Sequence, residues 1–313
     1  MSSTFINAGV VVSQALGVLE REVVLPNYVV RQPGTDFVGA KDDTVSLRVP
    51  AYSAARTRTM RAASGLTLDD LDETKVDVTL DTHIYKAITV TDEDLTLSIK
   101  DFGAQVTAPA VGAVVRGIED LLAAEMEGAT YETELTVDES DPYATIIAAR
   151  AALNKASVPA AGRFLAVGSD VESDLLLSDR LSNVNTSGSS DTLREAIIGR
   201  IGGFVAISVP GLDPATMIAA HRTAFVLALQ APAIPSGVSY GAASTFNGYA
   251  LRTLRDYLPD GASGPADRLL TDVFAGTAAV KDHGTVDGDG IFTPDADESA
   301  ILVRAVKCAI SGS

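Results

Sequence analysis

Apolar and polar residues alternate with helical spacing through residues 98–127. Apolar side chains recur there every three or four positions, and most charged residues fall between them. The spacing predicts one long amphipathic helix, and Ser98 and Asp101 stand at the spacing of a capping box. Pro109 interrupts the pattern, because proline inside a helix removes a backbone hydrogen bond and crowds the preceding turn. The helix is therefore expected either to kink at Pro109 or to begin in earnest near residue 107.

The region before this helix shows the period of two that is typical of strands. Residues 45–50 and 55–61 both alternate in this way, and a short Pro-Ala-Tyr-Ser link joins them. We expect an exposed, hairpin-like excursion over residues 29–75, followed by more strand structure in residues 76–90. Residues 1–28 have too little apolar surface to fold alone, so they are expected to lie as an arm on something else, in the same subunit or its neighbour.

Helical and strand patterns alternate in residues 129–240, as in a compact α/β domain. The expected elements are a helix at 142–155, a buried strand at 163–167, a helix at 170–177 capped by Ser169, a loop at 183–191, a helix from Thr192 that Gly202 and Gly203 end, and apolar segments at 204–209 and 217–229.

Strand patterns return near the end of the chain. Residues 248–257 and 267–274 predict two long strands joined by a turn rich in Gly, Pro and Asp. Residues 282–297 are acidic and rich in turn formers, and residues 301–310 predict a final strand. The two long strands are expected to pack on the sheet beside the long helix, because the domain at 129–240, which lies between the helix and these strands in the sequence, has already closed.

Composition narrows the class of protein. The chain has 313 residues, of which 46% are hydrophobic, so it can bury a sizeable core. Its 24 Lys and Arg face 41 Asp and Glu, which gives a formal net charge of -17 and argues against a protein that grips nucleic-acid phosphates. Cys308 is the single cysteine and is expected to be a small buried residue. The uncharged run between Arg222 and Arg252 is broken by proline and polar residues well short of a membrane span.

Several segments, in this order, carry a family resemblance. They are KVDVTLDTHIYKAITVTDEDL, SIKDFGAQVTAPAVGAVVRGIEDLLAAE, LREAIIGRIGGFVAISVPGL and GYALRTLRDYLPDGASGPADRLLTDVFAGTAAV. Together with the arm and the arginine-bearing excursion, they resemble the major capsid proteins of tailed phages with the Hong Kong ninety-seven-like fold. Coat proteins that use a separate scaffolding protein look most similar.

The resemblance implies an α+β fold and a division of the chain into parts. These are an N-terminal arm (1–28), an extended loop (29–75), a peripheral domain with a long spine helix (76–128), an axial domain (129–240), further peripheral strands (241–280) and a C-terminal turn and strand (281–313).

The implied function is that of a structural protein. Many copies would form the hexamers and pentamers of an icosahedral shell, which encloses double-stranded DNA without binding it specifically. The implied partners are a scaffolding protein, a portal protein and decoration proteins. The implied location is the virion, after assembly in the host cytoplasm, and neither an enzymatic activity nor a cofactor, metal or membrane is implied.

Two departures from the family pattern matter. Shells that are welded covalently use a lysine near the tip of the extended loop, whereas residues 50–66 contain none. Members with a built-in scaffolding region begin with a long charged helical extension, which this sequence lacks, so a separate scaffolding protein is implied.

The candidate contact residues between subunits are charged. In the family the extended loop lies across the peripheral domain of the adjacent subunit. We therefore expect arginines of the loop to meet acidic residues of the long helix, unless the arginines only keep the loop soluble and apolar residues such as Met60 and Leu66 make the contact. The candidates are Arg56, Arg58 and Arg61 on the loop, and Glu119, Asp120 and Glu125 on the helix.

Other readings of the sequence remain open. Protein compartments of the encapsulin kind share the same fold. Ser239 lies in a Gly-x-Ser-x-Gly segment, and Asp256 and His283 follow in the order of a hydrolase triad, although prolines precede Ser239 and a strand is expected after it. Asp287 and Asp289 have part of the spacing of a calcium loop. A soluble binding module is the third alternative.

Overall fold

The computed structural model describes most of the chain. The described residues are 24–33, 44–49, 58–60, 74–93, 102–138, 141–178, 199–238, 240–246, 248–261, 264–295 and 298–310.

Within these residues, the longest strands form a six-stranded sheet, hereafter the first sheet. Its path is β1-β10-β13-β12-β11, and β4 pairs with the other edge of β13. The strands are β1 (Val30–Pro33), β4 (Thr82–Thr91), β10 (Phe225–Gln230), β11 (Tyr240–Phe246), β12 (Tyr249–Gly261) and β13 (Gly264–Ala279). β12 and β13 are the two long strands that the sequence predicts, and they pair antiparallel.

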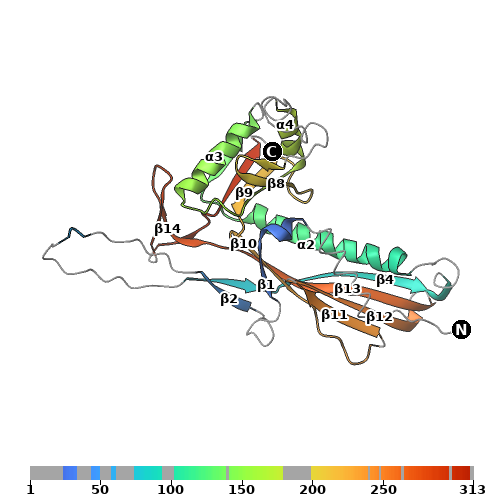
Figure 1. Ribbon diagram of the computed structural model, residues 1–313. Coiled ribbons are helices and arrows are strands. Elements are labelled where there is room, and N and C mark those ends of the chain that lie inside the picture. The colour runs from blue at the N-terminus through green and yellow to red at the C-terminus, as the bar shows by residue number, and fades with distance from the viewer. Residues whose placement is uncertain are drawn as a thin grey trace.

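The long helix lies across the first sheet (Figure 1). α2 (Ala108–Gly128) follows a π-helical turn, η5 (Gly103–Thr107), with Pro109 in its first turn. Proline is accommodated there because the π-helical turn just before it already departs from the regular α-helical hydrogen-bond pattern to which an amide at position 109 would contribute. The predicted start near residue 107 is therefore confirmed, while Ser98 and Asp101 lie outside the described residues.

A second six-stranded sheet in the described part of the chain packs on the other side of α2. Its order is β5-β17-β9-β6-β8-β7. The strands are β5 (Glu134–Val137), β6 (Arg163–Val167), β7 (Arg200–Ile201), β8 (Phe204–Ser208), β9 (Thr216–His221) and β17 (Ala305–Ile310). Two helices, α3 (Pro142–Lys155) and α4 (Ser169–Leu177), cover its far face.

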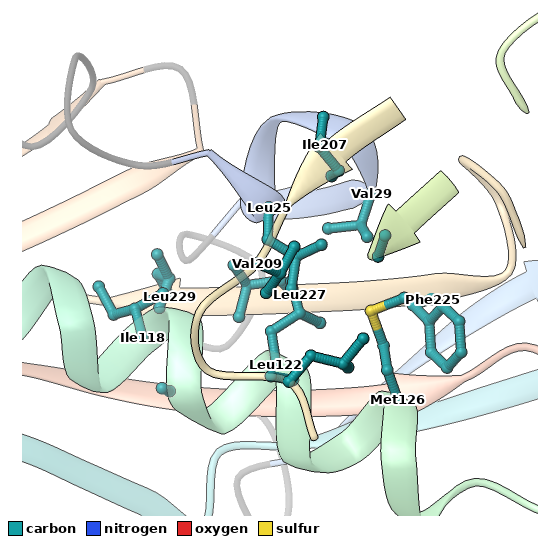
Figure 2. Packing of buried hydrophobic residues seen from close by; sticks show 14 of the residues in the cluster. Leu25, Val29, Ile118, Leu122, Met126, Ile207, Val209, Phe225, Leu227 and Leu229 are labelled. Atoms are coloured by element: carbon teal, nitrogen blue, oxygen red, sulfur yellow. The ribbon is translucent and has the colours of Figure 1, made fainter. Parts of the chain in front are cut away.

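One core joins both sheets to α2 (Figure 2). Ile118, Leu122 and Met126 of the helix meet Phe225 and Leu227 of the first sheet. The same cluster contains Phe164 and Ala166 of β6, and Leu25 in the short helix η1 (Leu25–Tyr28). Because α2 is covered from both sides, its buried face is wider than a single amphipathic stripe requires.

Two smaller units complete the fold. β2 (Thr44–Val49) and β3 (Thr74–Thr79) form an antiparallel ladder that projects from the body (Figure 1). β14 (Asp282–Val286) pairs with β15 (Phe292–Pro294) and β16 (Ala300–Ile301) in a small third sheet.

Some local expectations are confirmed and others are wrong. The helix at 142–155 and the buried strand at 163–167 have the predicted bounds. Arg200–Ile201 is a strand, not the end of a helix, because Gly202 and Gly203 have positive φ angles and make the tight turn of a hairpin. Ser169 is the first residue of α4, and Gly168 holds the cap position.

The expected pairing in the excursion is also wrong. Residues 45–49 form a strand, but their partner is 74–79. Of the expected partner 55–61, the described residues 58–60 are not strand. Alternation is a local signal, whereas the choice of partner depends on contacts with the first sheet. Residues 183–191 lie outside the described residues.

Candidate assembly surfaces

The β2–β3 ladder has one apolar and one polar face. Its apolar side chains, including Val45, Val76 and Val78, pack on the side of the first sheet that faces away from α2, against Val226 and Ala228. Strand alternation therefore gives the ladder one face for anchoring and one face for solvent.

Polar pairs follow the outer face of the ladder. The hydroxyl of Ser46 donates to the carboxylate of Asp77, and Lys75 lies 3.3 Å from the same carboxylate. These two hydrogen bonds lower the pKa of Asp77. Thr44 and Thr79 join their hydroxyls at 2.8 Å at the end next to the body.

A close backbone approach fixes the ladder to the sheet. A Cβ atom on Gly276 of β13 would overlap the backbone carbonyl of Thr79, the last residue of β3. Only glycine lets the two backbones lie this close. The ladder therefore leaves the first sheet at a defined place.

Of the three candidate arginines, only Arg58 lies in the described part of the chain; Arg56 and Arg61 fall outside it. Arg58, Thr59 and Met60 are exposed, and 89% of Met60 is accessible to solvent. Because residues 58–60 are not strand, strand alternation does not place Arg58 on a common face with Arg56.

The three candidate acidic residues of α2 have different surroundings. Glu119 accepts hydrogen bonds from the backbone amides of Val24, at 2.6 Å, and Leu25, at 3.3 Å. Glu125 accepts one from the hydroxyl of Thr277 on β13, at 3.4 Å. Asp120 is exposed, and its carboxylate lies beside Gly211. Of the three, Asp120 is the most exposed.

Glu127 was not among the sequence candidates. Its carboxylate accepts a hydrogen bond from the backbone amide of Asp213, which follows β8, and its backbone carbonyl accepts one from Lys307 on β17, at 3.1 Å. Through these hydrogen bonds, Glu119, Glu125 and Glu127 connect α2 to segments far away in the sequence. No sequence signal distinguishes such carboxylates from solvated ones.

The side of the first sheet that faces away from α2 carries exposed aromatic residues. Tyr85 of β4 is 62% exposed and Phe274 of β13 is 38% exposed. The ring of His83 lies between them, with centroid distances of 5.4 Å to Tyr85 and 5.0 Å to Phe274. We call these three residues the aromatic cluster. Exposed apolar groups of this kind are typical of contact surfaces when they are contiguous.

Charges next to the aromatic cluster are paired. Asp272 is fully buried and accepts hydrogen bonds from Arg252, with Nε 2.9 Å from Oδ1, and from Nε2 of His83 at 3.0 Å. Asp256 and Arg268 face each other across the same two strands at 3.2 Å. This surface is therefore close to neutral in a chain with a formal charge of -17.

The comparisons with known proteins decide the fold. No protein-family model matches the chain, and no curated protein matches its sequence. A chain from Mycobacterium phage Che8 aligns with 93% of this chain and 93% of its own length, at 19% identity and a TM-score of 0.63. A chain from the capsid of cyanophage P-SCSP1u covers 91% of this chain and 86% of its own, at 10% identity and a TM-score of 0.60. The chain has the Hong Kong ninety-seven-like capsid fold.

A third similar structure is not described as a phage. A chain from the virus-like particle of Pyrococcus furiosus covers 95% of this chain and 96% of its own, at 10% identity and a TM-score of 0.51.

The capsid fold does not provide the setting for a hydrolase. A nucleophile elbow needs a strand before the serine and a helix after it. Residues 231–238 are not strand, and the strand β11 begins at Tyr240; Ser239 itself lies outside the described residues. Asp256 pairs with Arg268, while His283 bonds the backbone carbonyl of Glu298 at 2.7 Å in the third sheet.

The segment with partial calcium-loop spacing is a turn. The carboxylate of Asp287 accepts hydrogen bonds from the amides of Asp289, at 3.0 Å, and Ile291, at 2.8 Å. Among the described residues, no group of three or more His, Cys, Asp and Glu is arranged to hold a metal ion. Cys308 is buried, which raises the pKa of its thiol to about 12. No helix in the described part of the chain is long and apolar enough to cross a membrane.

Proposed function

We propose that the protein is the major capsid protein of a tailed double-stranded DNA phage. The observation that carries this proposal is the fold: the similarity to the chain from phage Che8 covers 93% of this chain and 93% of that chain. Many copies assemble into an icosahedral shell, and the protein is then located in the virion.

Two surfaces support self-assembly. The segment at Met60 exposes a large apolar side chain that a neighbouring molecule would bury, and the aromatic cluster offers apolar area without net charge. Two subunits that each carry a charge of -17 repel one another, so a contact surface is expected to be neutral or locally complementary. Several weak contacts on each subunit add up through effective concentration.

The loop arginines are the second part of the proposal. Arg58, with Arg56 and Arg61, contacts acidic residues on the spine helix of the adjacent subunit. Asp120 is the preferred partner, because Glu119 and Glu125 already accept hydrogen bonds within their own chain. An exposed pair contributes only about 0.2 to 1 kcal/mol, but the contact recurs at every subunit junction.

The remaining partners follow from a capsid role. The acidic chain holds DNA by confinement and does not bind its phosphates, so the packaged genome slides during filling and ejection. A separate scaffolding protein guides assembly, a portal occupies one vertex, and decoration proteins bind outside. The chain acts as a structural protein and not as an enzyme.

A compartment shell is the second candidate. The similarity to the Pyrococcus furiosus virus-like particle supports it, because that alignment covers 95% of this chain. The two candidates differ in cargo: a capsid encloses a genome, and a compartment encloses protein.

Nuclease protection separates the two candidates. Particles are isolated from cells that carry the complete phage-like gene cluster, treated with nuclease, and then opened. Double-stranded DNA of uniform length inside the particles is expected for a capsid. Particles that protect protein but no DNA would favour the compartment.

A further inference from the structure

The two large sheets are joined by a very short link. β9 of the second sheet ends at His221 and β10 of the first sheet begins at Phe225, so only residues 222–224 lie between them. A second connection passes from β13 through the third sheet to β17, and Arg304 stands directly before β17. The two connections meet where the amide of His221 donates a hydrogen bond to the backbone carbonyl of Arg304.

His221 lies where the two connections meet and is only 7% exposed. Its Nε2 lies 2.9 Å from the carbonyl oxygen of Ala161, so this nitrogen carries a proton and donates it. Its Nδ1 accepts from the backbone amide of Thr223 at 3.3 Å and lies 2.8 Å from the hydroxyl of Thr223. The carbonyl of Ala161 requires a donor at Nε2, and the amide of Thr223 requires an acceptor at Nδ1, so the ring is neutral in this arrangement.

Arg304 completes the arrangement from the second connection. Its Nη1 donates to the hydroxyl oxygen of Thr223 at 3.0 Å, and its Nε donates to Asp282 of β14 at 2.6 Å. Its backbone carbonyl accepts a hydrogen bond from the amide of His221 at 3.0 Å. Arg304 therefore donates to Thr223, the amide of Thr223 donates to His221, and His221 donates to Ala161.

The charged groups around the ring oppose a second proton. Arg163 of β6 is the cross-strand neighbour of His221, Arg222 follows it in the link, and Arg304 faces it from the segment before β17. Asp282 is the nearest carboxylate of this network, and Arg304 already neutralises it. Burial, and then these arginines, lower the pKa of His221 below its ordinary value of 6.5, against the opposing effect of the Ala161 carbonyl.

We propose that neutral His221 is a latch that holds the link between the two sheets, and that protonation of the ring opens it. A proton on Nδ1 opposes the amide of Thr223, which is itself a donor. The hydroxyl of Thr223 accepts this proton only when it turns its own hydrogen away from the ring, while it still accepts from Arg304. The amide of Thr223 then loses its partner, a second cation lies next to the guanidinium of Arg304, and the link at residues 222–224 opens more readily.

The sign of the pH dependence follows from linkage. The closed link binds the proton more weakly than the open link, so it is fully favoured above about pH 6.5 and is weakened as the pH falls towards the lowered pKa. In this interval the equilibrium constant for opening of the link rises by up to about tenfold for each unit by which the pH falls. The latch belongs to the single chain and does not require the shell.

Hydrogen exchange of the full chain tests the latch. Exchange is followed by mass spectrometry between about pH 7.5 and pH 5, after correction for the intrinsic pH dependence of amide exchange. In the wild type, we expect the peptides that contain residues 221–224 and 302–305 to lose protection as the pH falls. In His221→Gln, which does not titrate, protection of the same peptides is expected to be independent of pH.

His283→Gln is the matched control, because it removes another histidine from the second connection while leaving the latch in place. In this variant, the protection of the peptides that contain residues 221–224 and 302–305 should keep the wild-type pH dependence. A histidine titration of the wild type by NMR covers the case in which His221→Gln does not fold, and should give His221 a pKa below 6.5. A normal or raised pKa, or equal pH dependence in wild type and His221→Gln, would overturn the proposal.

Discussion

Asp272 links the strands that carry the aromatic cluster on the first sheet. It is fully buried, whereas Arg252, its main partner, keeps 11% of its side chain exposed. A buried carboxylate with a two-fold contact to arginine and a third contact to histidine holds β4, β12 and β13 in one register. The same carboxylate orients His83 beside Tyr85 and Phe274.

Replacing Asp272 tests this role. We expect Asp272→Asn to lower the free energy of unfolding by about 3 to 5 kcal/mol, because it leaves Arg252 charged and nearly buried without its counter-charge. Asp256→Asn, on the same strand pair but half-exposed, should cost only about 0.2 to 1 kcal/mol. Urea unfolding followed by circular dichroism compares the two variants, and equal losses would contradict the account.

The roles of individual residues were the hardest feature to predict from the sequence. The sequence contains Arg252, Asp272, Asp256 and Arg268, but their pairing depends on the register of β12 and β13, which is irregular between Leu258 and Gly261. In the same way, the polar face of α2 does not tell which carboxylates bind segments of the same chain. The contribution of Glu127 was therefore missed.

At the scale of elements, α2 and its neighbours follow from local patterns. A helix that packs on one side shows a period of 3.6, and a strand covered on both faces is apolar throughout; α3 and β6 therefore agree with the prediction. The partner of β2 was wrong because β3 lies some 30 residues away, and only contacts with the first sheet select it.

The anchoring of the ladder gives a prediction at this scale. Gly276→Ala should lower the free energy of unfolding by about 1 to 3 kcal/mol, because the new methyl group overlaps the backbone of Thr79 and neither strand can yield freely. It should also speed proteolysis between β2 and β3. Gly128→Ala is the control: a Cβ there meets nothing within 4 Å, and the stability should stay equal or rise by less than about 1 kcal/mol.

At the scale of the whole molecule, the chain combines a packed body with a projecting ladder. The layers run from α3 and α4 through the second sheet, α2 and the first sheet to the ladder (Figure 1). The apolar face of the ladder is stabilised by the first sheet, whereas its polar face and the segment at Met60 stay exposed. We propose that these exposed parts make contacts between subunits.

Charge reversal tests the proposed contact between subunits. Arg58→Glu should leave the subunit folded and reduce assembly, because like charges then meet at every junction. Adding Asp120→Lys should restore part of the assembly, most clearly at low salt, where such pairs are least screened. Light scattering across a salt series measures both. Normal assembly of Arg58→Glu at every salt concentration would remove this contact and leave Met60 and the aromatic cluster as the candidates.

Electron microscopy of the purified 313-residue chain, expressed with and without the products of its neighbouring genes, tests shell formation. We expect closed icosahedral particles of uniform diameter, in which the β2–β3 ladder of each subunit lies against an adjacent copy. A chain that stays monomeric at high concentration, even with its scaffolding partner present, would contradict it.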